Sequence, residues 1–325
     1  MIKSLGKADF CEEISMEKTE YIDINGTGHF FIEYETDFEK PVILYVHGGP
    51  GLAESLVGWE IAGYTEKFYN WIFYDQRGAG RTYYKSPDGL VTYEDIYSDL
   101  DAIVRMLHER YGKKIFIMAH NWGTIPAIRY VRENPRFIAG YIGNSQIVDM
   151  VNIAKTRCAR VKELALLAGS KRDVKTIDKL SEATGGTFAR ERLTKKQITK
   201  LNVLLGKYNI ASGTDKLLMK KIPTNPLYDM VDLRILMSGP KISYKLNEYM
   251  RGVNLFDEDK AYEVPMMFIT GNWDYQYPYK TAADYMEQLS APCKQMTVIE
   301  DATYDAMYEK PEEFWEAFTG FVDNV

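Results

Sequence analysis

The sequence PVILYVHGGPG, at residues 41–51, joins a short apolar run directly to a loop of glycine and proline. An apolar run of this length is typical of a strand that is buried on both faces of a sheet. The loop is therefore expected at the carboxyl end of a central strand, where open α/β sheets place their sites. A turn from strand to helix needs only one glycine, whereas three glycines also let a substrate carbonyl approach backbone N–H groups closely. We predict that this loop is functional.

Short apolar runs of the same kind recur along the rest of the chain. They lie at residues 71–74, 115–119, 138–142, 264–270 and 295–299. Between and after them, apolar residues at helical spacing predict helices at residues 93–111, 122–133 and 311–322. The alternation of strands and helices indicates an α/β protein with a mostly parallel sheet and helices on both faces.

The N-terminal part has a different pattern. Residues 21–24 and 29–34 alternate apolar and polar side chains around Asn25-Gly26, which predicts two half-buried strands joined by a tight hairpin. With this hairpin the sheet is expected to have about eight strands, the first pair antiparallel and the rest parallel.

The composition is that of a chain able to bury a large core. Of its 325 residues 46% are hydrophobic, and 40 Lys and Arg against 46 Asp and Glu give a net charge of -6. This balance favours neither nucleic acid nor an anionic membrane as a partner, and no stretch approaches the roughly 20 apolar residues of a membrane helix. Because Cys11, Cys158 and Cys293 lie far apart and form no CxxC pair, we expect no disulfide framework, no metal or other cofactor, and a cytoplasmic location.

The strand and helix alternation stops at about residue 149 and resumes near residue 258. The stretch between is rich in Lys, Arg, Leu and Ala, has helical periodicity and contains no comparable apolar run. We predict a helical cap at 149–257, inserted between two parts of an α/β core at 1–148 and 258–325. The cap should cover the carboxyl ends of the strands and enclose a pocket. Breaks between its helices are expected at Gly185, Gly186, Pro223, Pro226 and Pro240.

The sequence DQRGAGRT, at residues 75–82, follows the apolar run at 71–74. Taken alone it could be any charged turn. Coming some two dozen residues after HGGPG, however, it resembles the prolyl iminopeptidase branch of the α/β-hydrolases. The resemblance implies the α/β-hydrolase fold and an activity that releases N-terminal residues from small peptides or hydrolyses related amides and esters.

The same resemblance implies roles for the residues of both motifs. The backbone N–H groups of Gly48, Gly49 and Trp122 would form the oxyanion hole. Residues that would shape or support the site are His47, Pro50, Gly51, Arg77, His120 and Gly123.

In this family the nucleophile lies at a sharp turn between a strand and a helix, in the pattern small-x-Ser-x-Gly. The matching turn is Ala119-His120-Asn121-Trp122-Gly123, so Asn121 occupies the position of the serine. An amide has no ionisable O–H and its nitrogen lone pair is delocalised, so serine-type attack is excluded. Asparagine does tolerate the positive φ that such a turn demands. We expect Asn121 to keep the turn and lose the chemistry.

The acid of the family's triad has a counterpart, but the histidine does not. The sequence GNWDYQYP at residues 271–278 is similar to the family pattern Gly-x-x-Asp-x-x-x-Pro, which assigns Asp274 as the acid. The segment at 303–311 aligns through its glutamate and proline with the family's histidine segment, and Tyr304 then stands where the histidine belongs. A tyrosine, with a pKa of about 10, is a poor general base at neutral pH.

No change of alignment restores the triad, because no histidine follows Asn121. The histidines of the chain are His29, His47, His108 and His120. The family order of nucleophile, acid and histidine is therefore incomplete. We expect His47 and His120 to be structural rather than to act as the base, and Ser145, at the end of another strand, to be a turn residue.

Three hypotheses remain from the sequence. In the first, the chain is a hydrolase by descent that is catalytically inactive or severely impaired. In the second, it is a non-catalytic protein that binds a small peptide or small molecule in the pocket under the cap. In the third, it performs proton-transfer or lyase chemistry with Tyr304 and Asp274. Carboxylates of the cap can receive a free amino terminus in this family. The candidates for that role are Asp149, Glu163 and Glu182.

Overall fold

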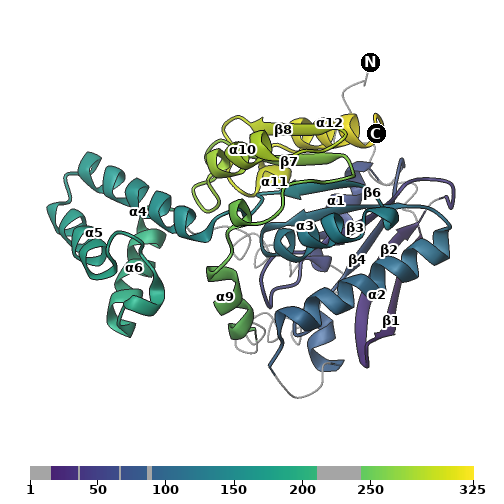
Figure 1. The fold of residues 1–325 in the computed structure, drawn as a ribbon, viewed down its shortest axis with the longest axis horizontal. Coiled ribbons are helices and arrows are strands. Elements are labelled where there is room, and N and C mark those ends of the chain that lie inside the picture. Colours follow the sequence, from purple (N-terminus) through teal and green to yellow (C-terminus); the bar gives the residue numbers. More distant parts are fainter. Residues whose placement is uncertain (1–15, 36, 66, 86–89, 211–242) are drawn as a thin grey trace.

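A computed structural model describes residues 16–35, 37–65, 67–85, 90–210 and 243–325 of the chain. Its centre is one eight-stranded sheet with the strand order β1-β2-β4-β3-β5-β6-β7-β8 (Figure 1). The strands are β1 (Met16–Ile24), β2 (Thr27–Glu35), β3 (Val42–Val46), β4 (Asn70–Tyr74), β5 (Ile115–His120), β6 (Ile138–Asn144), β7 (Met266–Gly271) and β8 (Lys294–Ile299). The predicted fold class, a mostly parallel α/β sheet of about eight strands, is confirmed.

The hairpin at the N-terminal edge of the sheet forms as its sequence predicts. Asn25 and Gly26 connect β1 to β2 with φ angles of 51° and 75°, the left-handed region that a two-residue hairpin turn requires. One detail of the prediction needs correction, because β2 is antiparallel to β4 as well as to β1. Strand β2 attaches the hairpin to the rest of the sheet, and it runs in the direction opposite to β4, its neighbour there. All the other pairings are parallel.

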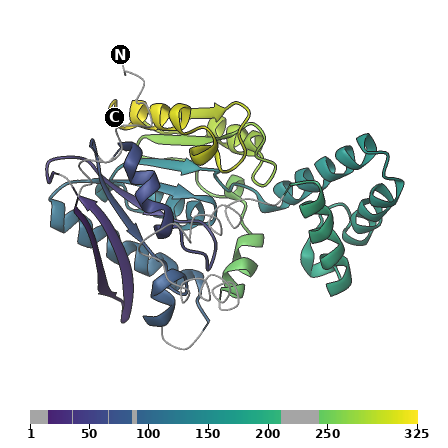
Figure 2. The ribbon, with the colours of Figure 1, turned by 180° about the vertical axis from the view of Figure 1, so that it is seen from behind.

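Both faces of the sheet are covered, which explains why its central strands are apolar throughout. In β3, Leu44 packs into the core on one face and Tyr45 into the core on the other. The helices α2 (Tyr93–Tyr111), α3 (Thr124–Glu133) and α10 (Tyr279–Gln288) cover the first face, and α1 (Gly58–Thr65) and α12 (Pro311–Val322) cover the second (Figure 2). The short helix α11 (Ala306–Glu309) precedes α12.

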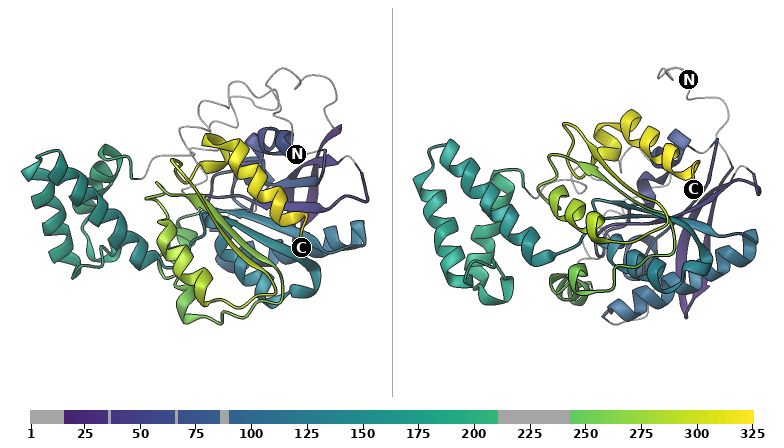
Figure 3. Two further views of the ribbon diagram at one scale, coloured as in Figure 1. Left: turned by 90° about the horizontal axis from the view of Figure 1, so that it is seen from above. Right: turned by 45° about the horizontal axis from the view of Figure 1, so that its top comes forward.

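Three helices between β6 and β7 form a separate lobe. They are α4 (Met150–Leu167), α5 (Lys171–Thr184) and α6 (Lys195–Lys207), and they enclose an apolar core of their own beside the sheet (Figure 3). Gly185, with a φ of 61°, ends α5, as its sequence predicts. A further helix, α9 (Tyr244–Arg251), returns the chain to the sheet.

The predicted cap also contains residues 211–242, with Pro223, Pro226 and Pro240, and these lie outside the described residues. The predicted cap and its position over the strand ends therefore stay predictions. In the part of the chain that the structure describes, no helix has the length and apolar character needed to cross a membrane.

Candidate active site

The turn after β5 has the conformation expected of a nucleophile elbow. Asn121 directly follows the strand, is largely buried, and has a φ of 51°, after which α3 begins at Thr124. Gly123 is required at this turn, because a Cβ atom there would collide with the carbonyl oxygens of Val46 and His47 at the end of β3. The elbow is therefore pressed against the glycine loop, and the two motifs singled out in the sequence lie side by side.

The amide of Asn121 is bonded to the turn itself. Its Oδ1 atom accepts a hydrogen bond from the backbone N–H of Trp122, one of the three N–H groups assigned to the oxyanion hole. A second, that of Gly48, donates to Oε2 of Glu54 at 3.0 Å. The third, that of Gly49, has no acceptor among the described residues. Two of the three donors thus have partners within the protein.

A buried ion pair lies beside Asn121. Nδ1 of His120, the residue before it, is 2.8 Å from Oε1 of Glu54, and both side chains are almost completely buried. Burial raises the pKa of the Glu54 carboxyl, but the charge and hydrogen bond of His120 outweigh burial and bring it down to about 2. Burial is the largest single effect on His120 and lowers its pKa, but the charge and hydrogen bond of Glu54, together with the charges of Asp305 and Asp274, raise that pKa above its usual value. The ion pair with Glu54 therefore favours the protonated form of His120, which makes it unsuited to serve as a base.

Tyr304, the residue at the histidine position of the family, packs against His120. Its ring stacks on that of His120, with the centroids 5.8 Å apart and the planes 10° from parallel. The structure thus brings together three residues of the proposed site, since Tyr304 lies beside the residue that precedes Asn121.

The acid candidate occupies the loop after β7. Asp274 is almost completely buried, and its Oδ1 accepts a hydrogen bond of 2.6 Å from the backbone N–H of Tyr277. Burial raises the pKa of this carboxyl to about 6, although Tyr277, Ser145 and Thr270 donate hydrogen bonds that lower it. The Ser145 hydroxyl also lies 3.3 Å from the carbonyl oxygen of Tyr304, which is an alternative acceptor for its one proton, and Ser145 has a φ of 50°. It is a turn residue, as expected, and it links the loops of Asp274 and Tyr304.

His47 is held in place by the loop after β4. Its Nε2 accepts a hydrogen bond from the Gln76 backbone N–H at 2.9 Å, and burial lowers its pKa, so the ring is neutral. The Gln76 side chain donates to the His47 carbonyl at 2.8 Å and accepts from the indole N–H of Trp122 at 2.9 Å. Gln76 therefore joins the glycine loop to the elbow.

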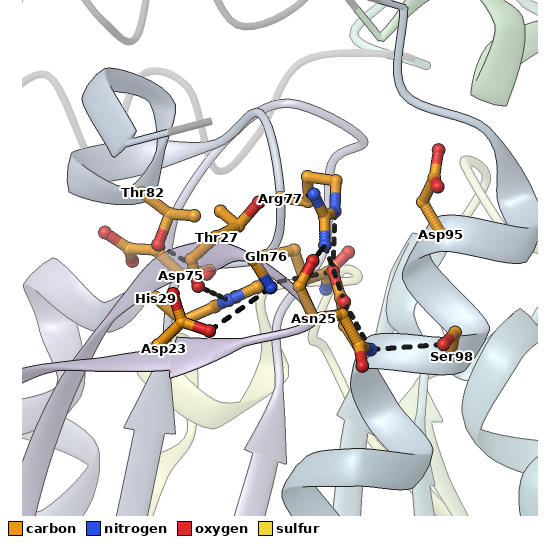
Figure 4. A network of polar contacts seen from close by, with 12 residues as sticks. Asp23, Asn25, Thr27, His29, Asp75, Gln76, Arg77, Thr82, Asp95 and Ser98 are labelled. Carbon is orange, nitrogen blue, oxygen red and sulfur yellow. Dashed lines mark hydrogen bonds and ion pairs between the residues drawn. The ribbon is translucent and has the colours of Figure 1, made fainter. Parts of the chain in front are cut away.

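Arg77 serves a different part of the molecule. Its guanidinium donates two hydrogen bonds of 2.8 Å to Asp99 on α2, and Asp99 also lies 3.2 Å from Nε2 of His29. Figure 4 shows Arg77 beside Asn25 and Thr27 of the hairpin. Asn25, at the hairpin turn, donates to Asp99 at 3.0 Å. Arg77 ties the β1–β2 hairpin to α2, so its support of the site is indirect.

Two residues of the site escaped the sequence analysis. Glu54 follows the glycine loop as the one charged residue of the mostly apolar stretch LAESLV, which was a signal that its carboxylate could be buried and paired. Gln76 lies inside the second motif, and no local feature distinguishes it from its neighbours. In the described residues no group of three or more His, Cys, Asp or Glu side chains is arranged to hold a metal ion.

A family model described as serine aminopeptidase, S33, matches residues 40–311. This chain belongs to that family. The match spans β3 to the start of α12, and so includes the glycine loop, the elbow and the loop of Asp274.

Relatives within the S33 family cover nearly the whole chain at low identity. A probable aminopeptidase, YbaC, of Bacillus subtilis is 22% identical over 308 residues, which are 93% of this chain and 95% of the relative. The proline iminopeptidase of Heyndrickxia coagulans is also 22% identical, over 94% of this chain and 98% of its own. The solved structure of the proline iminopeptidase of Mycobacterium smegmatis, 16% identical, covers 94% of this chain and 98% of its own with a TM-score of 0.64. The α/β-hydrolase fold is thereby established.

Proposed function

We propose that this S33 family member has lost serine-type hydrolysis, wholly or to a severe degree, and uses the retained frame to bind a small peptide or small molecule. The observation that carries the proposal is the hydrogen bond from the Trp122 N–H to Oδ1 of Asn121. In a hydrolase this N–H must be free to stabilise the oxyanion of the tetrahedral intermediate. Here the side chain at the nucleophile position occupies it.

The proton-transfer partner of the family is also missing. No histidine follows residue 120, and Tyr304 takes the position that aligns with the family's histidine. The adjacent imidazole, that of His120, is paired with Glu54, which favours its protonated form. A protonated imidazole cannot accept the proton of an attacking hydroxyl. Neither partner for acyl transfer is therefore available by the route that the family uses.

The relatives named as aminopeptidases support the expected ligand class, because the frame around the altered positions is retained. Asn121 has the positive φ of an elbow turn, and Asp274 is buried in the loop after β7. A pocket survives the loss of its catalytic groups, and the ligand class is therefore expected to remain a small peptide or a related amide.

The decisive experiment restores the two altered positions. The unmodified protein and an Asn121→Ser, Tyr304→His double variant are treated with a fluorophosphonate probe and with aminoacyl chromogenic substrates. We expect the double variant alone to be labelled and to turn substrate over, because the substitutions free the Trp122 N–H and supply a base. The same double variant with Ser145→Ala added checks that labelling does not occur at the neighbouring serine.

Two results would contradict the proposal. Labelling of the unmodified protein at residue 121, or turnover equal to that of the double variant, would show that the family's chemistry has been retained by another route. A folded double variant that remains inert would show that the frame itself is not preserved.

Proton-transfer or lyase chemistry is a second candidate, and one observation favours it. The pKa of Asp274, raised to about 6 by burial, lies close to neutral pH, where a carboxyl group can both accept and donate a proton. This candidate requires a measurable turnover that disappears in both Asp274→Asn and Tyr304→Phe. Retention of that turnover in either variant would exclude it.

A further inference from the structure

A cavity in the helical lobe is lined by three arginines. It has a volume of about 100 Å³ and lies between α4, α6, α9 and the segment at residues 187–191. Arg157 comes from α4, Arg190 from the segment before α6, and Arg251 from the end of α9. The chain as a whole is acidic, with a net charge of -6, whereas this lobe is rich in Lys and Arg, so the positive charge is concentrated here.

The three guanidinium groups lack anionic partners among the described residues. Arg190 donates to the neutral side chain of Asn202 at 2.7 Å, and Arg157 donates to the carbonyl oxygen of Gln276 at 2.6 Å. No ion pair in the described part of the chain includes any of the three. Burial lowers the pKa of Arg190, and the nearby charges of Arg251 and Arg157 lower it further. Within the described residues, the cluster thus holds positive charge that no ion pair balances, next to a cavity.

The rest of the cavity wall is largely apolar. Phe188, Leu201 and Leu205 line it, and all three are part of the core of the lobe. One carboxylate, that of the exposed Glu191, lies at its edge. A cavity of this kind suits a ligand with an anionic group at one end and a short apolar part at the other.

The cavity adjoins the loop of the candidate acid. The guanidinium of Arg157 lies over the ring of Tyr277, 5.0 Å from its centroid, and the Tyr277 backbone N–H donates to Asp274. The positive charge of Arg157 is close enough to lower the pKa of Asp274. A ligand held by the arginines would therefore lie next to the loop that carries Asp274.

The carboxylates considered from the sequence have other positions. Asp149 caps the first turn of α4 by accepting from the backbone N–H groups of Val151 and Asn152. Glu163 forms an ion pair with Arg160, and Glu182 is exposed on α5. None of the three lines the cavity. A receptor for a free amino group would need carboxylates. The described part of the lobe instead places three arginines in the wall of the cavity.

We propose that Arg157, Arg190 and Arg251 form a binding site for the carboxylate or phosphate group of a small amphipathic ligand. This inference goes beyond the proposed function, because the cavity lies in the helical lobe, beside the loop that carries Asp274. Arginine suits the role because its planar donors match two oxygens of a carboxylate or phosphate at once.

The test measures binding of hexanoate, hexyl phosphate, hexanamide and hexylamine to the full chain by calorimetry. We expect the two anions to bind at least about tenfold more tightly than the neutral amide, because hydrogen bonds to a charged group are worth more than neutral ones. Hexylamine should not bind measurably. A tighter affinity for the phosphate than for the carboxylate, or the reverse, identifies which anion the site prefers.

The variants are Arg190→Gln and, as a matched control, Arg192→Gln. Arg192 belongs to the same short 3-10 helix but is exposed and does not line the cavity. The first variant should weaken hexanoate binding about tenfold, and the control should leave it unchanged. Equal binding of hexanoate and hexanamide, or equal losses in the two variants, would overturn the inference. Turnover by the unmodified protein would contradict the proposed function and leave this binding result intact.

Discussion

Replacing Asp274 by asparagine should stabilise the protein at neutral pH. The carboxyl group has an ordinary pKa of 3.8 and a pKa of about 6 in the folded protein, because it is buried. A raised pKa contributes stability that is fully present below pH 3.8 and is lost as the pH rises through about 6. Above that pH the folded chain holds a buried carboxylate at a cost of about 3 kcal/mol, the free energy of a shift of about two pKa units. An asparagine avoids this cost.

The assay is chemical denaturation at a series of pH values. At pH 7.5 the Asp274→Asn variant should be about 3 kcal/mol more stable than the unmodified protein, and its melting temperature about 5 °C higher. Below about pH 4 the two proteins should be nearly equal, because the native aspartic acid is then neutral as well. Asparagine can still accept the hydrogen bond from the Tyr277 N–H, so the loop is expected to keep its conformation.

The matched control is Asp284→Asn, an exposed position on α10. It should show no stabilisation that depends on pH. The reasoning would be refuted if Asp274→Asn were less stable than the unmodified protein at pH 7.5, or if the difference between the two were the same at all pH values. A confirmed result would mean that the protein retains a costly charge at this position, which is the mark of a functional site rather than a structural one.

Three further predictions concern the frame of the site and the lobe. Glu54→Gln should cost about 3 kcal/mol of folding stability at neutral pH, because the buried histidine beside it loses its charged partner. This loss of stability, measured by denaturation, should shrink as the pH falls from 4.5 to about 2. A loss that does not depend on pH would contradict the pairing. The Gly123→Ala variant should fail to fold, or should unfold at a far lower denaturant concentration, because its Cβ would collide with carbonyl oxygens. Gly320 has open space around it, so Gly320→Ala should be tolerated. Equal effects of the two substitutions would refute the tight contact at Gly123. Iodoacetamide should modify the exposed Cys293 and leave Cys158 unmodified, because burial raises the pKa of the Cys158 thiol to about 12. Peptide mass spectrometry locates the modified cysteine. Labelling of Cys158 in the native protein would show that the lobe opens.

Much of the fold was predictable because its signals are local. A strand buried on both faces must be apolar at every position, and the runs in β3, β4 and β5 show that pattern without reference to the rest of the chain. The helices at Tyr93–Tyr111 and Pro311–Val322 begin and end at the predicted residues, because a capping threonine starts the first and a proline starts the second. The edge of the sheet was harder, because the direction of β2 relative to β4 depends on which strand the hairpin joins.

The elbow was predictable for the same reason, and its contacts were not. A strand, a small turn and a helix within one stretch of the sequence specify a positive φ at Asn121, and the structure has it. The partner of the Asn121 amide, the Trp122 N–H, follows only from the geometry of the turn. The absence of a histidine after residue 120 is a property of the sequence alone.

Only the tertiary structure joined groups that lie far apart in the chain. Glu54 and His120 are 66 residues apart, and they meet because β3 and β5 are neighbours in the sheet. The arginines of the cavity come from three separate segments of the lobe, and no pattern in any one of them indicates the others. Hydrophobic periodicity reports which face of a strand or helix is buried, but it carries no record of which elements pack together. The sequence by itself therefore determined the sheet, the elbow turn and the absence of a histidine after residue 120. The packing of distant elements decided which charged groups lie next to these features.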